Sequence, residues 1–152
     1  METLNKTLDN LSITIKIEFD AGHRVIGHEY KCKFLHGHRY ILLISFKSNN
    51  LNEIGFIEDF SILKKTIKNW IDENFDHTCI LSEKDKELGT LIVKNTGQKI
   101  FYLDQNPTVE NILIYLSQEL PIIVKKIPNN NFLVISSLEL FETPNCSAKI
   151  NL

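Results

Sequence analysis

Three histidines of this sequence have the types and spacing of a metal site: His23, His36 and His38. His36 and His38 are two residues apart, so in an extended chain both imidazoles lie on one face, and Gly37 between them lets another backbone approach. Three imidazoles leave one position of tetrahedral Zn²⁺ open, which is typical of catalytic zinc. Ordinary loop histidines are the alternative, but four of the five histidines fall within residues 23–38. We therefore predict Zn²⁺ as the cofactor, held by these three side chains.

A cysteine lies close to the predicted metal site. Cys32 precedes His36 by four residues and stands between Lys31 and Lys33. Two ammonium groups and a nearby dication favour the thiolate, which makes Cys32 a candidate general base or nucleophile. As a fourth zinc ligand it would close the site, and as a buried thiol it would be inert.

Further candidate groups lie outside this segment. Asp76 and His77 supply a carboxylate and an imidazole that it could orient, although adjacent residues point apart in a strand and need a turn to cooperate. A contact at the end of a helix is the alternative for this pair. Glu142 ends an apolar strand, where a carboxylate could accept two parallel hydrogen bonds from a guanidine-like ring edge, or could simply be an exposed acid. His28 is interpreted as a solvated loop residue, with a substrate contact as the alternative.

The strands that would position these groups are marked by apolar patterns. Ser12–Phe19 alternates apolar and polar residues, and His38–Lys47 is rich in bulky β-forming residues, so the two are expected to pair antiparallel around a functional loop. Gly55–Phe60 and Phe132–Phe141 are predicted as further strands, the first of them short. A short strand is also expected at Lys99–Leu103.

Two amphipathic helices are predicted between the strands. The first runs from Ile62, with Ser61 as its cap, and ends at Asp76-His77. The second opens at Pro107-Thr108 and is ended or kinked by Pro121. Between them, Glu83–Leu88 is expected to form a helical turn. The predicted fold class is α+β: an antiparallel four-stranded sheet with two helices packed on one face.

Composition sets the limits of this interpretation. A chain of 152 residues with 43% hydrophobic content fits a single domain over residues 1–152. A net charge of −2 with dispersed lysines and arginines predicts no nucleic-acid partner, and no apolar run approaches the roughly 20 residues of a membrane span. Residues 1–10 lack the pattern of a secretory signal, so we expect a cytoplasmic protein.

The cysteines point to the same compartment. Cys32, Cys79 and Cys146 are an odd number at irregular spacing, which argues against a disulfide framework and fits a reducing environment. Cys79 and Cys146 are both predicted to be buried and inert, because a free cysteine is usually part of the core.

Taken together in their order, the motifs resemble the 6-pyruvoyltetrahydropterin synthase and 6-carboxytetrahydropterin synthase family of the tunnelling fold. The resemblance spans nearly the whole chain. The matching segments are F-D-A-G-H-R at 19–24, K-C-K-F-L-H-G-H-R-Y at 31–40, G-F-I-E-D-F at 55–60, D-H at 76–77, N-P-T-V-E-N at 106–111 and E-T at 142–143. D-A-G-H departs from the commoner double-alanine form, and T-C-I-L after Asp76-His77 falls where the segment is expected to vary. Neither change touches a proposed ligand.

The resemblance implies roles for individual residues. It implies zinc binding by the three histidines, proton abstraction by Cys32, a relay formed by Asp76 and His77, and an anchor for the pterin ring at Glu142. Thr108 would help to hold the pterin. The implied substrate is 7,8-dihydroneopterin triphosphate, and from charge alone we expect cationic side chains to meet its triphosphate. The candidates are Lys31, Arg24 and Arg39.

The resemblance also implies an assembly and a choice of products. Sheets of several subunits would close into a β-barrel, in a homohexamer built as a dimer of trimers with active sites at subunit interfaces. We favour the 6-carboxy product of queuosine biosynthesis, with loss of acetaldehyde and triphosphate, and keep the 6-pyruvoyl product as the alternative. Three competing classes of protein are a non-catalytic zinc-binding module, a metal-free pterin aldolase relative and a zinc hydrolase that uses Glu29 as its base.

Overall fold

The fold is built on one mixed six-stranded sheet, seen in a computed structural model that describes residue 8 and residues 10–152. The strand order is β4-β3-β1-β2-β5-β6. The pairs β1–β2, β2–β5 and β5–β6 are antiparallel. The other two pairs, β1–β3 and β3–β4, are parallel. The strands are β1 (Ile13–His23), β2 (His36–Lys47), β3 (Thr78–Ser82), β4 (Ile100–Leu103), β5 (Val134–Thr143) and β6 (Cys146–Asn151).

The β1–β2 pair is the longest in the sheet and carries the histidines at its end. Its register runs without interruption from Ile13 opposite Phe46 to His23 opposite His36. Odd-numbered residues of β1 point into the core and even-numbered ones point away from it, which is the alternation that the sequence shows. The strands predicted at Ser12–Phe19 and His38–Lys47 are therefore confirmed, and both extend further toward the connecting loop.

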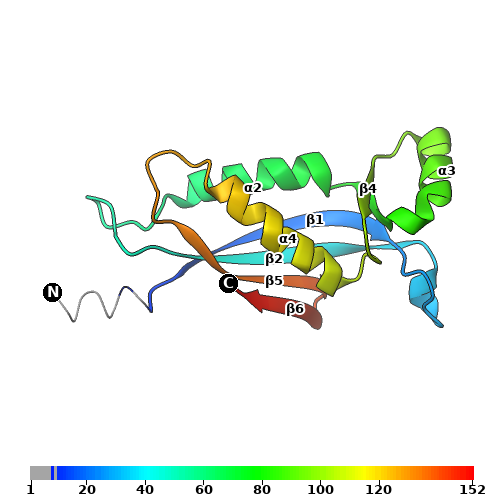
Figure 1. Ribbon diagram of the computed structural model, residues 1–152, viewed down its shortest axis with the longest axis horizontal. Helices are drawn as coiled ribbons and strands as arrows, with labels where there is room; N and C mark the ends of the chain where they lie inside the picture. Colours follow the sequence, from blue (N-terminus) through cyan, green and yellow to red (C-terminus); the bar gives the residue numbers. More distant parts are fainter. Residues whose placement is uncertain (1–7, 9) are drawn as a thin grey trace.

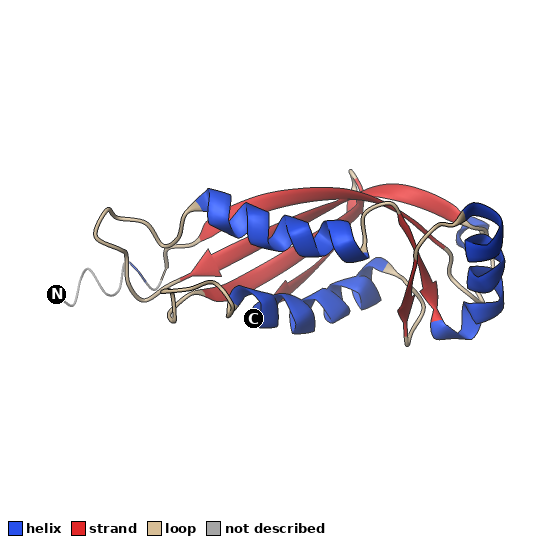
Figure 2. Cartoon of the chain, turned by 90° about the horizontal axis from the view of Figure 1, so that it is seen from above, coloured by secondary structure: helices blue, strands red, loops and turns tan. Residues whose placement is uncertain are grey.

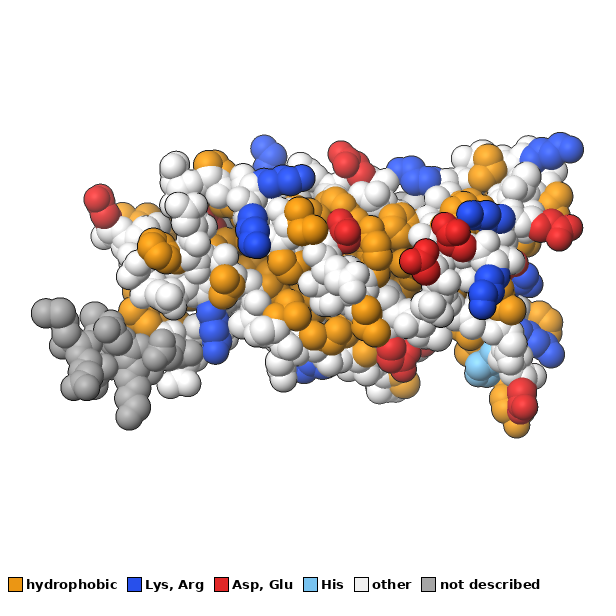
Figure 3. Space-filling model, viewed as in Figure 1, with side chains coloured by type: hydrophobic (Ala, Val, Ile, Leu, Met, Phe, Trp, Pro, Cys, Tyr) orange, Lys and Arg blue, Asp and Glu red, His pale blue; other side chains and the backbone are white. Residues whose placement is uncertain are grey.

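Two long helices, α2 (Phe60–Asn74) and α4 (Val109–Val124), cover one face of the sheet and run roughly along the strands (Figures 1 and 2). Their apolar faces meet the inward side chains of β1, β2 and β5 in one core. A shorter helix, α3 (Lys86–Thr96), stands at the end of the sheet near β3 and β4 (Figure 1). On the face that carries the helices, acidic and basic side chains are interspersed (Figure 3). Two 3₁₀ turns complete the elements: η1 (Lys31–Lys33) and η2 (Glu83–Asp85).

The predicted four-stranded antiparallel sheet is wrong in strand number and direction. β3 was missed because all five of its residues are buried, so it has no alternation of apolar and polar residues. β6 was missed because it is short, mostly exposed at the sheet edge and weakly apolar. The strand predicted at Gly55–Phe60 is a loop that ends where α2 begins at Phe60. Just before and within this loop, the Asn52 side chain accepts hydrogen bonds from Ile54 and Phe56.

The helix ends also differ in detail from the prediction. Asp59, not Ser61, caps α2, because its carboxylate accepts the Ser61 amide hydrogen bond at 2.7 Å. The second helix begins where it was expected, because Thr108 caps α4. Pro121 lies inside α4 without ending it, because the Pro121 carbonyl still accepts a hydrogen bond from Lys125 at 3.1 Å.

The segment between the two long helices contains more helix than expected. The helical turn predicted at Glu83–Leu88 is the beginning of a longer helical stretch, η2 followed by α3. The short strand expected at Lys99–Leu103 is confirmed as β4. None of the helices in the described part of the chain has the length and apolar character required to cross a membrane.

Candidate active site

The three histidines meet where β1 ends and β2 begins. His23 and His36 are cross-strand partners, and His38 is on the same face one pleat further along β2. Their ring centroids form a nearly equilateral triangle, 4.6 Å from His23 to His36, 5.1 Å from His23 to His38 and 4.9 Å from His36 to His38. One ring nitrogen of each lies within 4.8 Å of the others. The structure thus brings together the three predicted ligands.

Backbone carbonyls set the tautomer of two of these rings. His23 Nδ1 lies 2.7 Å from the Pro107 carbonyl oxygen, and His36 Nδ1 lies 2.8 Å from that of Phe34. A carbonyl only accepts, so Nδ1 carries the hydrogen in both rings and Nε2 keeps its lone pair. His23 Nε2 is buried and has no hydrogen-bond partner among the described residues. Metal-binding histidines typically have this arrangement.

Burial favours the neutral form that a metal needs. Loss of water lowers the pKa of His23, against an opposing effect of the Pro107 hydrogen bond and of Glu142. Burial likewise lowers the pKa of His38. Both imidazoles are therefore neutral near pH 7, as a ligand must be. The donor set, its tautomers and its buried lone pair fit Zn²⁺ with one open position.

Gly37 allows the close approach of β1 and β2 that this triangle requires. A Cβ atom at Gly37 would lie 3.1 Å from the Ala21 carbonyl oxygen, which is tighter than ordinary contact. Ala21 is the cross-strand partner of His38, so displacement there would move a predicted ligand. The glycine between the two histidines thus permits the close backbone approach that the sequence suggests.

A third strand brings Glu142 to the same place. Glu142 lies near the end of β5, which pairs with β2, and its side chain is partly buried. Its carboxylate oxygen Oε1 is 3.5 Å from His23 Nε2. A carboxylate thus lies beside the histidine triangle, close to the buried ring nitrogen of His23.

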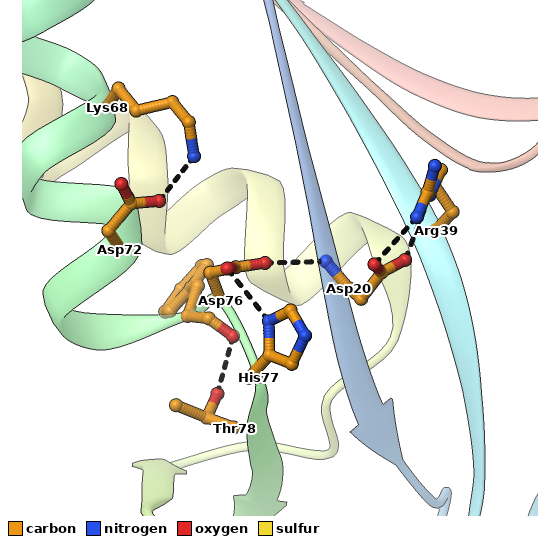
Figure 4. A network of polar contacts seen from close by, with 8 residues as sticks. Asp20, Arg39, Lys68, Asp72, Asp76, His77 and Thr78 are labelled. Atoms are coloured by element: carbon orange, nitrogen blue, oxygen red, sulfur yellow. Dashed lines mark hydrogen bonds and ion pairs between the residues drawn. The ribbon is translucent and has the colours of Figure 1, made fainter.

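Asp76 and His77 follow α2 and form a hydrogen-bonded pair (Figure 4). Asp76 Oδ2 is 2.8 Å from His77 Nδ1, while Asp76 Oδ1 accepts the Asp20 amide hydrogen bond at 2.9 Å. His77 has a left-handed backbone with φ 54°, and its amide donates to the Asp20 carbonyl at 2.7 Å. This turn is the one that adjacent residues need in order to cooperate.

The Asp76 carboxylate is suited to orient the imidazole. Burial raises the pKa of Asp76, but hydrogen bonds from the Asp20 amide and from His77 outweigh it and lower the pKa overall. The His77 side chain is 78% exposed, so its far edge is open to solvent or to another molecule. His77 and His38 both line one open cleft of about 390 Å³, together with Asp20, Gly22, Arg39 and Gln98.

Cys32 lies in η1, in the loop between the two histidine-bearing strands. Its side chain is half-buried, and its carbonyl accepts a hydrogen bond from the Val25 amide at 2.8 Å. This bond ties η1 to the chain two residues beyond His23. Lys31 and Lys33 on either side are exposed.

The remaining site candidates have structural partners. The Arg24 guanidinium donates two hydrogen bonds to the carboxylate of Asp85, which is 5% exposed. Arg39 donates to Asp20 at 3.0 and 2.9 Å. The Thr108 hydroxyl accepts a 3.3 Å hydrogen bond from an amide of α4. The structure does not bring Arg24 or Arg39 to the site as unpaired cations.

The other histidine and cysteines were also interpreted from sequence. His28 is exposed in a loop, as expected, and its Nδ1 accepts a hydrogen bond from the Tyr30 amide. Cys79 is buried, as expected, and burial raises its pKa to about 11. Cys146 is exposed, so its predicted burial is wrong, because β6 is an edge strand.

Residues that support the site were missed in the sequence. Asp20 and Pro107 hold catalytic candidates through backbone atoms, and nothing in their residue type signals this role. Asp85 carried no local signal because its partner is 61 residues away. Tyr40 could have been noticed, because it continues the i, i+2 series of His36 and His38.

One α+β fold thus carries a triangle of three histidines and a hydrogen-bonded Asp-His pair, the features that the resemblance of the motifs predicts. The family model described as 6-pyruvoyl tetrahydropterin synthase matches residues 12–152. The chain therefore belongs to the 6-pyruvoyl tetrahydropterin synthase family of enzymes, and the resemblance inferred from its motifs is confirmed.

Several curated relatives carry a more specific name. The 6-carboxy-5,6,7,8-tetrahydropterin synthase of Rickettsia felis is 51% identical over 140 residues, covering 92% of this chain and 99% of the relative. The protein of that name from Rickettsia bellii is 47% identical with the same coverage. The corresponding Haemophilus influenzae protein is 32% identical over 139 residues, covering 87% of this chain and 92% of the relative.

Solved structures support the fold. An uncharacterized protein from Wolinella succinogenes superposes with a TM-score of 0.73 at 23% identity, covering 93% of this chain and 97% of that one. The 6-pyruvoyl tetrahydropterin synthase of Caenorhabditis elegans superposes with a TM-score of 0.64 at 22% identity, covering 93% and 94%. At these identities the likeness establishes the α+β fold.

Proposed function

We propose that this chain is a zinc-dependent 6-carboxy-5,6,7,8-tetrahydropterin synthase. It would convert 7,8-dihydroneopterin triphosphate to 6-carboxytetrahydropterin with loss of acetaldehyde and triphosphate. The observation that carries the proposal is the histidine triangle with the unpaired, buried Nε2 of His23. The choice of the carboxy product is supported by relatives of that name at 47–51% identity along nearly their whole length.

Each site residue has a role in this proposal. Zn²⁺ held by the three histidines would polarise an oxygen on the side chain of the substrate. Cys32 takes a neighbouring carbon-bound proton, and Asp76 orients His77 so that its imidazole can move a proton. Glu142 accepts two N–H groups of the pterin ring through its carboxylate.

Two further residues would contact the substrate. Thr108 would contact the pterin with the hydroxyl that also caps α4, since a hydroxyl can donate while it accepts. Lys31 is the favoured contact for the triphosphate because it is exposed beside Cys32, whereas Arg24 and Arg39 are each paired with an aspartate.

The proposal includes assembly and pathway. We propose a homohexamer, a dimer of trimers, whose active sites lie at subunit interfaces and whose product enters queuosine biosynthesis in the cytoplasm. The exposure of His77 beside an open cleft supports an interface site, because another subunit could complete it.

Product analysis tests the reaction. The zinc-loaded protein is incubated with 7,8-dihydroneopterin triphosphate and its products are identified by mass spectrometry. We expect 6-carboxytetrahydropterin and acetaldehyde, lost in Cys32→Ala and retained in Cys146→Ala, a matched control at an exposed cysteine on β6. Formation of 6-pyruvoyltetrahydropterin would assign the sister activity. If neither product formed, the proposal would be refuted.

Metal analysis tests the site separately. We expect one zinc per chain in the purified protein and its loss in His36→Ala. His28→Ala is the matched control, because His28 is an exposed loop histidine of the same segment. Equal zinc content in both variants would refute the three-histidine assignment.

A further inference from the structure

Tyr40 is a buried tyrosine beside the histidine triangle with no role in the proposal above. Its side chain is 0% exposed and stacks on Phe19 with ring centroids 5.1 Å apart. Its ring stands nearly perpendicular to His23 and His38, at centroid distances of 6.0 and 5.8 Å. Tyr40 therefore packs directly against two rings of the histidine triangle.

The Tyr40 hydroxyl lacks a hydrogen-bond partner. Within the described part of the chain, only two buried side-chain polar atoms are unpaired, His23 Nε2 and the Tyr40 hydroxyl oxygen. Buried polar groups nearly always have a partner. Phenylalanine would fill the same space without this unsatisfied group. The two unpaired atoms belong to side chains in ring contact, so a single cause can account for both. That cause is a ligand that binds at this site from outside the chain.

We propose that Tyr40 is a further substrate-binding residue, whose hydroxyl donates a hydrogen bond to an oxygen atom of the ligand on the open side of the histidine triangle. A neutral phenol is a donor at physiological pH. The Glu142 carboxylate does not serve as the acceptor within the chain, because its Oε1 lies 3.5 Å from His23 Nε2 and makes no hydrogen bond to Tyr40. The inference rests on the metal site proposed above.

The test uses the cobalt-substituted protein and acetohydroxamate, an oxygen-donor probe whose binding changes the visible spectrum of Co²⁺. Tyr40→Phe should bind cobalt with the same stoichiometry as the wild type but bind acetohydroxamate roughly 5- to 30-fold more weakly, the range expected for one lost hydrogen bond in a desolvated site. Tyr115→Phe, a partly buried tyrosine on α4, is the matched control and should match the wild type.

Three outcomes are distinguishable. Equal acetohydroxamate affinity in Tyr40→Phe and the wild type would overturn the inference while leaving the metal site intact. Failure of the wild type to bind cobalt, or unchanged binding in His36→Ala, would refute the metal site and the inference with it. The metal-free Tyr40→Phe protein should melt at or above the wild-type temperature. A clearly lower melting temperature would show that the hydroxyl has a structural partner, and would also overturn the inference.

Discussion

Replacing Arg24 by methionine should destabilise the protein, because it leaves a buried carboxylate without its partner. Asp85 is 5% exposed and lies where η2 meets α3. Breaking a fully buried ion pair from one side costs about 3–5 kcal/mol. The Arg24 side chain remains 34% exposed, so solvent screens part of the effect, and we expect a loss of about 2 kcal/mol in the free energy of unfolding.

The assay is urea unfolding of metal-free protein at one fixed protein concentration, so that assembly does not differ between samples. The double variant Arg24→Met/Asp85→Leu removes both charges and should return to within about 1 kcal/mol of the wild type. Arg39→Met is the matched control, because the Arg39–Asp20 pair is exposed, with Arg39 67% accessible. Its change should stay within about 1 kcal/mol.

Two results would refute this reasoning. If the double variant were no more stable than Arg24→Met, the unpaired Asp85 carboxylate would not be the cause of the loss in the free energy of unfolding. A loss below about 0.5 kcal/mol in Arg24→Met would place the pair among surface salt bridges, despite the burial of Asp85. If Arg24→Met also raised KM for the proposed triphosphate substrate, Arg24 would again be a candidate for contacting that substrate.

Three shorter predictions concern the site. Burial lowers the pKa of His23, so near pH 6.5 the unfolded chain binds a proton that the folded chain does not. The melting temperature of the metal-free protein should therefore fall as the pH falls below about 6.5, and this fall should be smaller in His23→Asn. Asp76→Asn should lower kcat roughly 10²-fold or more while keeping the fold by circular dichroism, since an amide oxygen can still accept from Asp20. Gly37→Ala should cost about 1–3 kcal/mol and weaken zinc binding in a chelator competition assay, since its Cβ would crowd the Ala21 carbonyl.

The half of the fold that carries the three histidines was predictable because its signals are local. Alternation identified β1, and the His36-Gly37-His38 spacing placed two histidines on one face. The third histidine joins them because two consecutive strands pair in register, down to His23 opposite His36. The antiparallel hairpin thus turns a sequence motif directly into a site.

The parallel part of the sheet was only partly predictable by the same means, since the β4 strand was expected but β3 and the strand directions were not. β3 pairs in parallel with β1, and β4 pairs in parallel with β3. Parallel pairing is set by the helices that connect the strands rather than by a turn. A five-residue strand buried along its whole length also carries no period that distinguishes it from a helix. Direction and strand number therefore depended on tertiary packing that the local pattern does not encode.

The Asp76-His77 pair shows why the chemistry of a site can depend on contacts far away in sequence. Two adjacent side chains cooperate here because His77 adopts φ 54°, a conformation that is unfavourable for a residue with a Cβ atom. Nothing at positions 76 and 77 requires that conformation. Asp20, 56 residues earlier, offers its amide to Asp76 and its carbonyl to His77, and so fixes both backbone and carboxylate. The same strand continues to His23, so β1 supports the Asp-His pair and the histidine triangle at once, and a shift of this strand end would disturb both.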